Sequence, residues 1–182
     1  MLSTNKMGNT CMKQCYKTSV KDDNFQEVAI NSNQAKYIEK EIPSGCKRKD
    51  LKKYVPQLSS GRVVDVYDGD TFTIAGRVAY NPELFQFQVR VNGIDTPEKR
   101  TNNENEKYVA NIAKEFVKEK IMDKIVELHG VTTDKYGRLL ADVVYKGENI
   151  GQELIKNRLA VAYDGGTKNC PDDWKKYYED SN

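Results

Sequence analysis

The sequence predicts an α+β fold, in which a five-stranded Greek-key barrel of the OB type carries about three helices. Three observations lead to this prediction. Apolar and polar residues alternate in segments between residues 62 and 92, and turn residues separate these segments. A segment with helical spacing follows the third strand, and two more strand-like segments follow that helix. Five strands with a helix after the third are typical of this barrel.

The first two strands are predicted to form a hairpin. Alternation begins at Arg62 and is expected to place Val64 and Val66 on one face. The pair Asp68-Gly69 then strongly favours a tight hairpin turn. The return strand runs from Thr71 to Ile74.

The third strand has the clearest period of two in the chain. Apolar Phe85, Phe87, Val89 and Val91 alternate with polar Gln86, Gln88, Arg90 and Asn92. The pattern therefore places Arg90 on the face opposite the apolar row, where it can project toward a ligand.

A helix is predicted after the third strand. Thr101 to Glu104 fits a capping box at its start. The apolar residues then follow helical spacing: Tyr108, Ile112, Ala113, Phe116, Val117 and Ile121. Lys124 to Val131 and Leu139 to Tyr145 are predicted as the last two barrel strands, joined by a polar turn from Thr132 to Gly137.

Two shorter helices are predicted near the C-terminus. Asn149 is expected to cap the first of them. An extended segment from Leu159 to Tyr163 follows, and Pro171 is expected to open a last helix that contains Trp174.

Charge divides the 182-residue chain into a tail, residues 1–58, and a domain, residues 59–182. Residues 1–60 contain 11 Lys/Arg and 6 Asp/Glu, a net charge of +5, whereas residues 61–182 contain 18 and 21, a net charge of −3. A phosphate-handling site in the domain would therefore depend on local arginines and a bound cation.

The tail is predicted to be flexible, polar and basic. We interpret its cluster Lys47 to Lys53 as a solvated linker; phosphate steering, contact with an anionic membrane and a nuclear address are the alternatives. Translation from Met7 would expose Gly8 for myristoylation beside cysteines that could be palmitoylated, but Met12 departs from that motif. Weak membrane association through such a lipidated or basic tail is one expectation.

The expected location is intracellular, because no secretory signal is found. The nucleus, the cytoplasm and a membrane surface stay open, and a monomer is expected. The cysteines Cys11, Cys15, Cys46 and Cys170 form no CxxC pair, so reduced thiols are expected rather than a zinc site.

Two short carboxylate clusters are the main functional signal. Asp68-Gly69-Asp70-Thr71 and Asp95-Thr96-Pro97-Glu98 would each be dismissed as an ordinary turn if found alone. Together they offer Asp70, Asp95 and a backbone carbonyl such as that of Thr96. These hard oxygen ligands suit Ca²⁺ or Mg²⁺ rather than zinc or copper.

The remaining groups suit phosphodiester chemistry. Glu98 could act as general base toward water. Arg90 and Arg138 could neutralise charge on a five-coordinate phosphorus, because the planar guanidinium grips two phosphate oxygens. Lys135 and Tyr136 could hold a flanking phosphate and a sugar or base. Each of these residues could equally be an ordinary surface side chain when considered alone.

Several enzyme classes lose support. The only histidine, His129, lies in a strand-like segment, which disfavours histidine-based nucleases, double-histidine phosphodiesterases and Ser-His-Asp hydrolases. No Gly-rich loop with Lys-Ser/Thr is found, so hydrolysis of nucleoside triphosphates is not indicated.

Three motifs resemble those of the staphylococcal nuclease (thermonuclease) family: Val66 to Thr71, Arg90 to Glu98, and Thr133 to Arg138. The likeness covers roughly residues 60–165 in motif order and spacing. Leu159 to Tyr163 also resembles a later family segment that carries a substrate-contacting tyrosine.

The resemblance implies an OB-fold barrel with one catalytic Ca²⁺ ion bound by Asp70, Asp95 and the Thr96 carbonyl. It implies that Glu98 activates the attacking water and that Arg90 and Arg138 stabilise the transition state. Lys135, Tyr136 and Tyr163 correspond to residues near the substrate phosphate and nucleotide.

The expected activity is sequence-nonspecific hydrolysis of DNA and RNA that leaves 3′-phosphate ends. The alternative is a catalytically weak or inactive module of the same fold that binds nucleic acid or protein.

Overall fold

A computed structural model describes residues 44–79, 81–167 and 169–180. The chain divides into two units, Met1–Leu51 and Lys52–Asn182. Within the described part of the first unit, the one regular element is the 3-10 helix η1 (Arg48–Asp50). Cys11, Cys15 and the segment that begins at Met7 lie outside the described residues, and the tail boundary at residue 58 stays a prediction.

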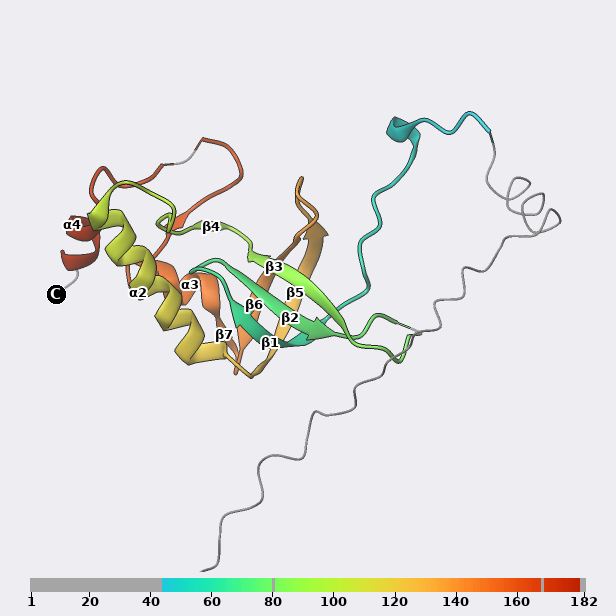
Figure 1. Cartoon of the computed structure of the whole chain (residues 1–182), viewed down its shortest axis with the longest axis horizontal. Coiled ribbons are helices and arrows are strands. Elements are labelled where there is room, and N and C mark those ends of the chain that lie inside the picture. Colours follow the sequence, from blue (N-terminus) through green and yellow to red (C-terminus); the bar gives the residue numbers. More distant parts are fainter. Residues whose placement is uncertain (1–43, 80, 168, 181–182) are drawn as a thin grey trace, which may run out of the picture. The chain divides into compact units, whose positions relative to one another are not determined.

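The second unit contains the predicted barrel (Figure 1). Its five strands are β1 (Ser60–Val66), β2 (Thr71–Gly76), β3 (Phe85–Val91), β5 (Ile125–Thr133) and β6 (Leu139–Tyr145). They pair in the order β3-β2-β1-β5-β6, and parallel pairing of β3 with β6 closes the barrel. This confirms the Greek-key barrel with three helices, because the closing strands β3 and β6 are separated by α2 and β5 in the chain.

A β-bulge in β1 makes one prediction wrong. The register of β1 against β2 shifts between Val63 and Asp65, so the alternation changes phase. Val63 is therefore buried beside Val66 in the core, whereas Val64, which was expected inside, is 42% exposed.

The alternation in β2 and β3 is confirmed except at the start of β3, where Phe85 is 36% exposed. Phe72 and Ile74 of β2 are buried in the core, as are Val89 and Val91 of β3. Leu58, just before β1, belongs to the same core. Each buried side chain of this size contributes roughly 1.5–3 kcal/mol to stability.

Helix α2 (Glu104–Ile121) begins two residues later than the capping box at Thr101 predicts. Its N-cap is Asn103, whose side chain accepts hydrogen bonds from the amides of Asn105 and Glu106, so the capping box at Thr101 is wrong. The helix buries Val109, Ala110, Ala113, Val117 and Ile121. Tyr108, expected on the buried face, is 51% exposed because the buried stripe passes through Val109 instead.

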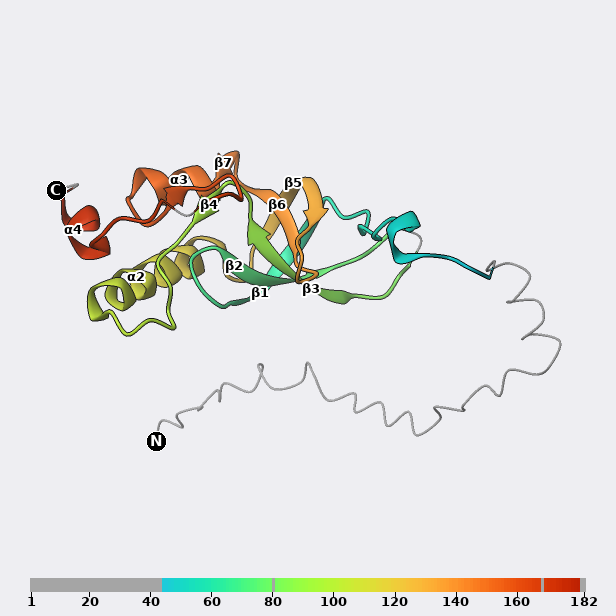
Figure 2. The same ribbon diagram turned by 90° about the horizontal axis from the view of Figure 1, so that it is seen from above.

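Two shorter helices follow β6. Asn149 caps α3 (Ile150–Lys156) as predicted, accepting a hydrogen bond from the Gln152 amide. Helix α4 (Trp174–Glu179) is capped by Asp173, so Pro171 precedes the helix rather than opening it. Figure 2 shows α2, α3 and α4 on the same side of the barrel.

The unit also has three two-residue strands, two of which, β4 (Ile94–Asp95) and β7 (Glu148–Asn149), were not predicted. β7 pairs with β6. β4 pairs with β8 (Val161–Ala162), within the segment predicted to be extended. Among the helices in the described ranges, none is long and apolar enough to cross a membrane.

Candidate active site

The β1–β2 turn is tightly packed. The amides of Tyr67 and Asp68 both donate to the Thr71 carbonyl, at 3.0 and 3.2 Å. A Cβ atom on Gly69 would lie 2.9 Å from Cβ of Ala113 in α2 and 3.0 Å from Cγ2 of Thr96. Glycine is therefore required here because α2 and the Thr96 segment approach the turn closely.

The turn buries the carboxylate of Asp70. Asp70 is only 3% exposed. Its Oδ1 accepts a hydrogen bond from the Thr71 hydroxyl at 2.8 Å. The Asp70 amide in turn donates to Oδ1 of Asp68 at 3.3 Å. Asp68 thus supports the turn, in agreement with its interpretation as a turn residue.

Arg90 joins the two carboxylate clusters. It lies opposite Thr71 in the β2–β3 pairing, on the face away from the core residues Val89 and Val91. Its guanidinium forms an ion pair with Asp70 and donates to Oδ1 of Asp95 at 3.0 Å. Burial alone disfavours its charge, but attraction to the two carboxylates raises the pKa of Arg90 above its ordinary value.

Asp95 is positioned by a long-range strand pairing. It lies opposite Val161 in the short β4–β8 ladder, and its residue is 2% exposed. The thiol of Cys170 donates to Oδ2 of Asp95 at 3.6 Å. Sequence reasoning missed this contact, because a cysteine 75 residues away carries no local signal.

The donor set fits a hard cation. Asp70 and Asp95 both contact the same guanidinium, so two carboxylates converge on one positive charge and a net negative charge remains. Burial raises the pKa of Asp68 to about 7, and repulsion from the neighbouring Asp70 adds to the rise. Across the described ranges, no group of three or more His, Cys, Asp or Glu side chains gathers to hold a metal. A cation here would therefore take two carboxylates, backbone oxygen such as the Thr96 carbonyl, and water or substrate oxygen.

Arg138 is oriented by Asp134 across the β5–β6 turn. Its Nε donates to Oδ2 of Asp134 at 2.7 Å, and its amide donates to Oδ1 at 3.0 Å. Its Nη1 also donates to the Thr71 hydroxyl at 3.3 Å. Thr71 therefore contacts both Asp70 and Arg138, which links the two turns.

Asp134 was not predicted as a site residue, although it starts the motif that contains Arg138. Burial alone would raise its pKa, but hydrogen bonds from Arg138 and from backbone amides lower the pKa of Asp134 below its ordinary value. Asp134 therefore stays ionised as a partner for the guanidinium at neutral pH.

The remaining predicted residues lie at the rim. Tyr136 is 73% exposed, with Nζ of Lys135 at 5.0 Å and Cζ of Arg138 at 5.6 Å from its ring centroid. The hydroxyl of Tyr163 donates to the Gly166 carbonyl at 3.3 Å. Glu98 is exposed, and its amide donates to Oε1 of Glu106 at 3.1 Å.

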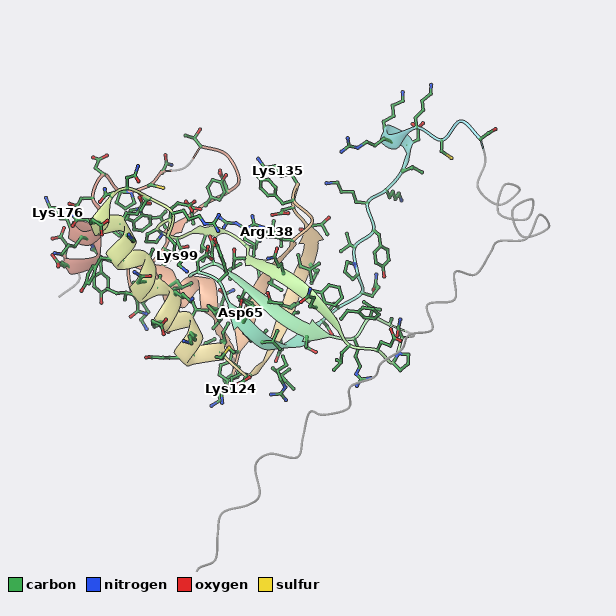
Figure 3. All side chains as sticks on the ribbon, viewed as in Figure 1. Asp65, Lys99, Lys124, Lys135, Arg138 and Lys176 are labelled. Atoms are coloured by element: carbon green, nitrogen blue, oxygen red, sulfur yellow. The ribbon has the colours of Figure 1, made fainter. Side chains whose placement is uncertain are left out.

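Most of these groups line one cavity of about 880 Å³. Its lining includes eight of the nine predicted site residues: Asp70, Arg90, Thr96, Glu98, Lys135, Tyr136, Arg138 and Tyr163. Asp95 is not in the lining and reaches the site through its contact with Arg90. Figure 3 shows Arg138 close to the base of the β5–β6 hairpin and Lys135 toward its tip. The arrangement can grip an anionic group with two guanidiniums beside buried carboxylates.

The chain is similar in sequence to known proteins. The family model described as "Staphylococcal nuclease homologue" matches residues 88–181. A probable endonuclease of Schizosaccharomyces pombe is 37% identical over 84 residues, 42% of this chain and 36% of that protein. An uncharacterized endonuclease of Haemophilus influenzae is 33% identical over 102 residues, 56% and 51% of the two chains. Endonuclease YncB of Bacillus subtilis is 28% identical over 149 residues, 79% and 66%. The chain thus spans between about a third and two thirds of these relatives.

Proposed function

Since the chain belongs to the staphylococcal nuclease homologue family, we propose that it is a calcium-dependent, sequence-nonspecific nuclease that cleaves DNA and RNA. One observation carries the proposal. Arg90 and Arg138, 48 positions apart in the chain, line the same cavity as Asp70 and Glu98. Relatives that are named endonucleases support the same class of activity. The products proposed are 3′-phosphate ends.

Asp70, Asp95 and the Thr96 carbonyl would hold the calcium ion, because they are hard oxygen donors with excess negative charge. When bound, calcium acts as a Lewis acid that polarises a phosphoryl oxygen.

The two arginines would stabilise the transition state. Hydrolysis places additional negative charge on the phosphoryl oxygens, and guanidiniums held in advance lower the energy of that charge. Arg138 is held by Asp134 and Thr71, and Arg90 by the two buried aspartates. Neither side chain has to reorganise from bulk water as the charge develops.

Glu98 would accept a proton from the attacking water. It is exposed and lines the cavity beside Thr96 and Pro97. A carboxylate in this place can reach water in the cavity, and general-base catalysis of this kind contributes typically about 10²–10⁴-fold.

Lys135, Tyr136 and Tyr163 would bind the substrate around the reacting phosphate. Tyr136 offers an exposed ring for stacking, with the positive charge of Lys135 beside it. Tyr163 is held at the rim by its amide, which donates to the Gly93 carbonyl at 2.9 Å.

The decisive experiment is a calcium titration of cleavage on single-stranded DNA, duplex DNA and RNA, with the product ends identified. We expect calcium-dependent cleavage that stops in chelator, and Glu98→Gln and Arg138→Ala should each lower kcat by at least about 10²-fold. Undiminished cleavage in chelator would refute the calcium role. Tight strand binding with no cleavage under any condition would favour the alternative, a binding module.

Calcium binding can also be measured without cleavage. Calcium at 100 times its Kd should stabilise the fold by about 2.7 kcal/mol, seen as a rise in Tm. Asp70→Asn should abolish that rise. Asp142→Asn is the matched control, because Asp142 lies in β6 and does not line the cavity. An equal calcium response in the wild type and Asp70→Asn would show that Asp70 is no ligand.

A further inference from the structure

A second aromatic side chain with a lysine beside it borders the cavity. Tyr67 lines the cavity and is 43% exposed, although it directly follows the buried Val66. Nζ of Lys99 lies 5.2 Å from its ring centroid and donates to its carbonyl oxygen at 3.1 Å. The arrangement repeats that of Tyr136 with Lys135 on a different turn.

The two pairs lie at separate parts of the rim. Tyr67 begins the β1–β2 turn, whereas Tyr136 lies in the β5–β6 turn. Figure 3 shows Lys99 toward α2 and Lys135 at the tip of the β5–β6 hairpin. A ligand that fills the cavity and reaches both pairs must therefore be extended.

Two other cations, Lys114 and Arg100, lie near Lys99, as does the carboxyl group of Asp68. Burial, the nearby Lys114 and Arg100 lower the pKa of Lys99, and Asp68 opposes them only in part. Like charges held close together are relieved by an anion, and phosphate is the anion that repeats along a nucleic acid.

We propose that Tyr67 and Lys99 form a second nucleotide-binding platform, which stacks a base on Tyr67 and pairs a backbone phosphate with Lys99. The proposal rests on the nucleic-acid substrate proposed above. An exposed tyrosine ring accepts any base, because every base has a flat face, and an adjacent cation holds the phosphate. The stacked base must be free of a partner strand. The platform therefore takes unpaired strand at a part of the rim separate from that of Tyr136.

The test is equilibrium binding of a labelled 12-nucleotide oligothymidylate. Binding is measured by fluorescence anisotropy in the presence of chelator at several KCl concentrations. Tyr67→Ala should raise Kd about fivefold to hundredfold through lost stacking. Tyr67→Phe keeps the ring and should stay within about twofold. Lys99→Met should lower the slope of log Kd against log salt by about 0.7, the value for one phosphate contact on a single strand. Lys99→Arg should restore that slope.

Tyr108 with Lys175 is the matched control. Nζ of Lys175 lies 5.7 Å from the exposed Tyr108 ring, and neither residue lines the cavity. Tyr108→Ala and Lys175→Met should leave both Kd and its salt slope unchanged. Wild-type binding by Tyr67→Ala, or a wild-type slope in Lys99→Met, would overturn the platform.

The outcomes also separate the platform from the nuclease proposal. If the wild type cleaves in calcium and Tyr67→Ala binds as the wild type does, the platform alone is refuted. If the wild type binds the strand with the predicted variant effects but never cleaves, the nuclease proposal alone is refuted. A wild type that neither binds nor cleaves refutes both.

Discussion

The two turns that border the cavity differ in how they are held. The β1–β2 turn is packed against α2 and Thr96, and it buries Asp70. The β5–β6 turn exposes Tyr136, and a Cβ atom on its Gly137 would meet nothing within 4 Å. The turn that carries a carboxylate for the proposed cation is therefore fixed by its packing against α2 and Thr96. The β5–β6 turn instead holds Arg138 through hydrogen bonds to Asp134 and Thr71, and it leaves Tyr136 open to solvent.

Substitution of the two arginines should give the largest changes in activity and stability. Arg90→Ala should lower kcat at least about 10²-fold and destabilise the fold by about 3–5 kcal/mol, because it leaves two buried carboxylates without their partner. Arg138→Ala should lower kcat similarly but stability by only about 1.5–3 kcal/mol, because it removes hydrogen bonds to one partly buried carboxylate. Urea unfolding beside cleavage rates measures both quantities. Equal destabilisation by the two substitutions would break the comparison.

The rise in Tm that calcium produces gives a second test of Arg90. Without the guanidinium, Asp70 and Asp95 keep their full negative charge, so calcium should raise the Tm of Arg90→Ala more than that of the wild type. Thermal melts with calcium and with chelator check this. A smaller calcium response in Arg90→Ala would mean that Arg90 itself is needed for binding the ion.

The two glycines test the packing directly. Gly69→Ala should destabilise the fold by about 1–3 kcal/mol by overpacking against Ala113. Gly137→Ala should cost about 1–2 kcal/mol, because its φ of +88° strains any other residue. A double-mutant cycle tells the causes apart. Ala113→Gly should recover part of the loss in Gly69→Ala and none in Gly137→Ala.

The smallest effect concerns Asp134 and pH. Its folded pKa is lowered below the ordinary 3.8, so its stabilising contribution is complete well above pH 3.8 and disappears as the pH falls through the folded pKa. The stability difference between the wild type and Asp134→Asn should therefore be constant near neutral pH and shrink below pH 3.8. Urea unfolding at several pH values measures it. A difference that grows on acidification would contradict the pairing with Arg138.

The sequence predicted much of the site because local periodicity places side chains on faces. The alternation in β3 placed Arg90 opposite the core, and the Asp68-Gly69 pair located the turn that presents Asp70. Both signals depend on neighbours in the chain. The chemistry of the two carboxylate clusters suggested the metal ligands and Glu98, and the motif likeness added Tyr163, which periodicity alone does not indicate.

What the sequence did not predict depends on contacts between distant segments or on local irregularity. The bulge between Val63 and Asp65 put Val64 and Val66 on different faces, so that Val64 is exposed and Val66 is buried. The β4–β8 pairing that holds Asp95 is two residues long, too short for a periodic pattern. The thiol of Cys170 reaches Asp95 only through the path of the folded chain.

The parallel closure of the barrel has a consequence for how the protein is made. Arg90 and Arg138 line one cavity only after β3 pairs with β6, at Val89, Arg90 and Val91 against Leu139, Leu140 and Ala141. Asp95 takes its place only after it pairs with Val161 of β8. A nascent chain that has not yet left the ribosome beyond residue 161 cannot assemble the cavity. Synthesis proceeds at about 5–20 residues per second, so the groups proposed to cut nucleic acid stay apart for several seconds after β3 emerges. We expect the growing chain to be harmless to the messenger RNA that encodes it.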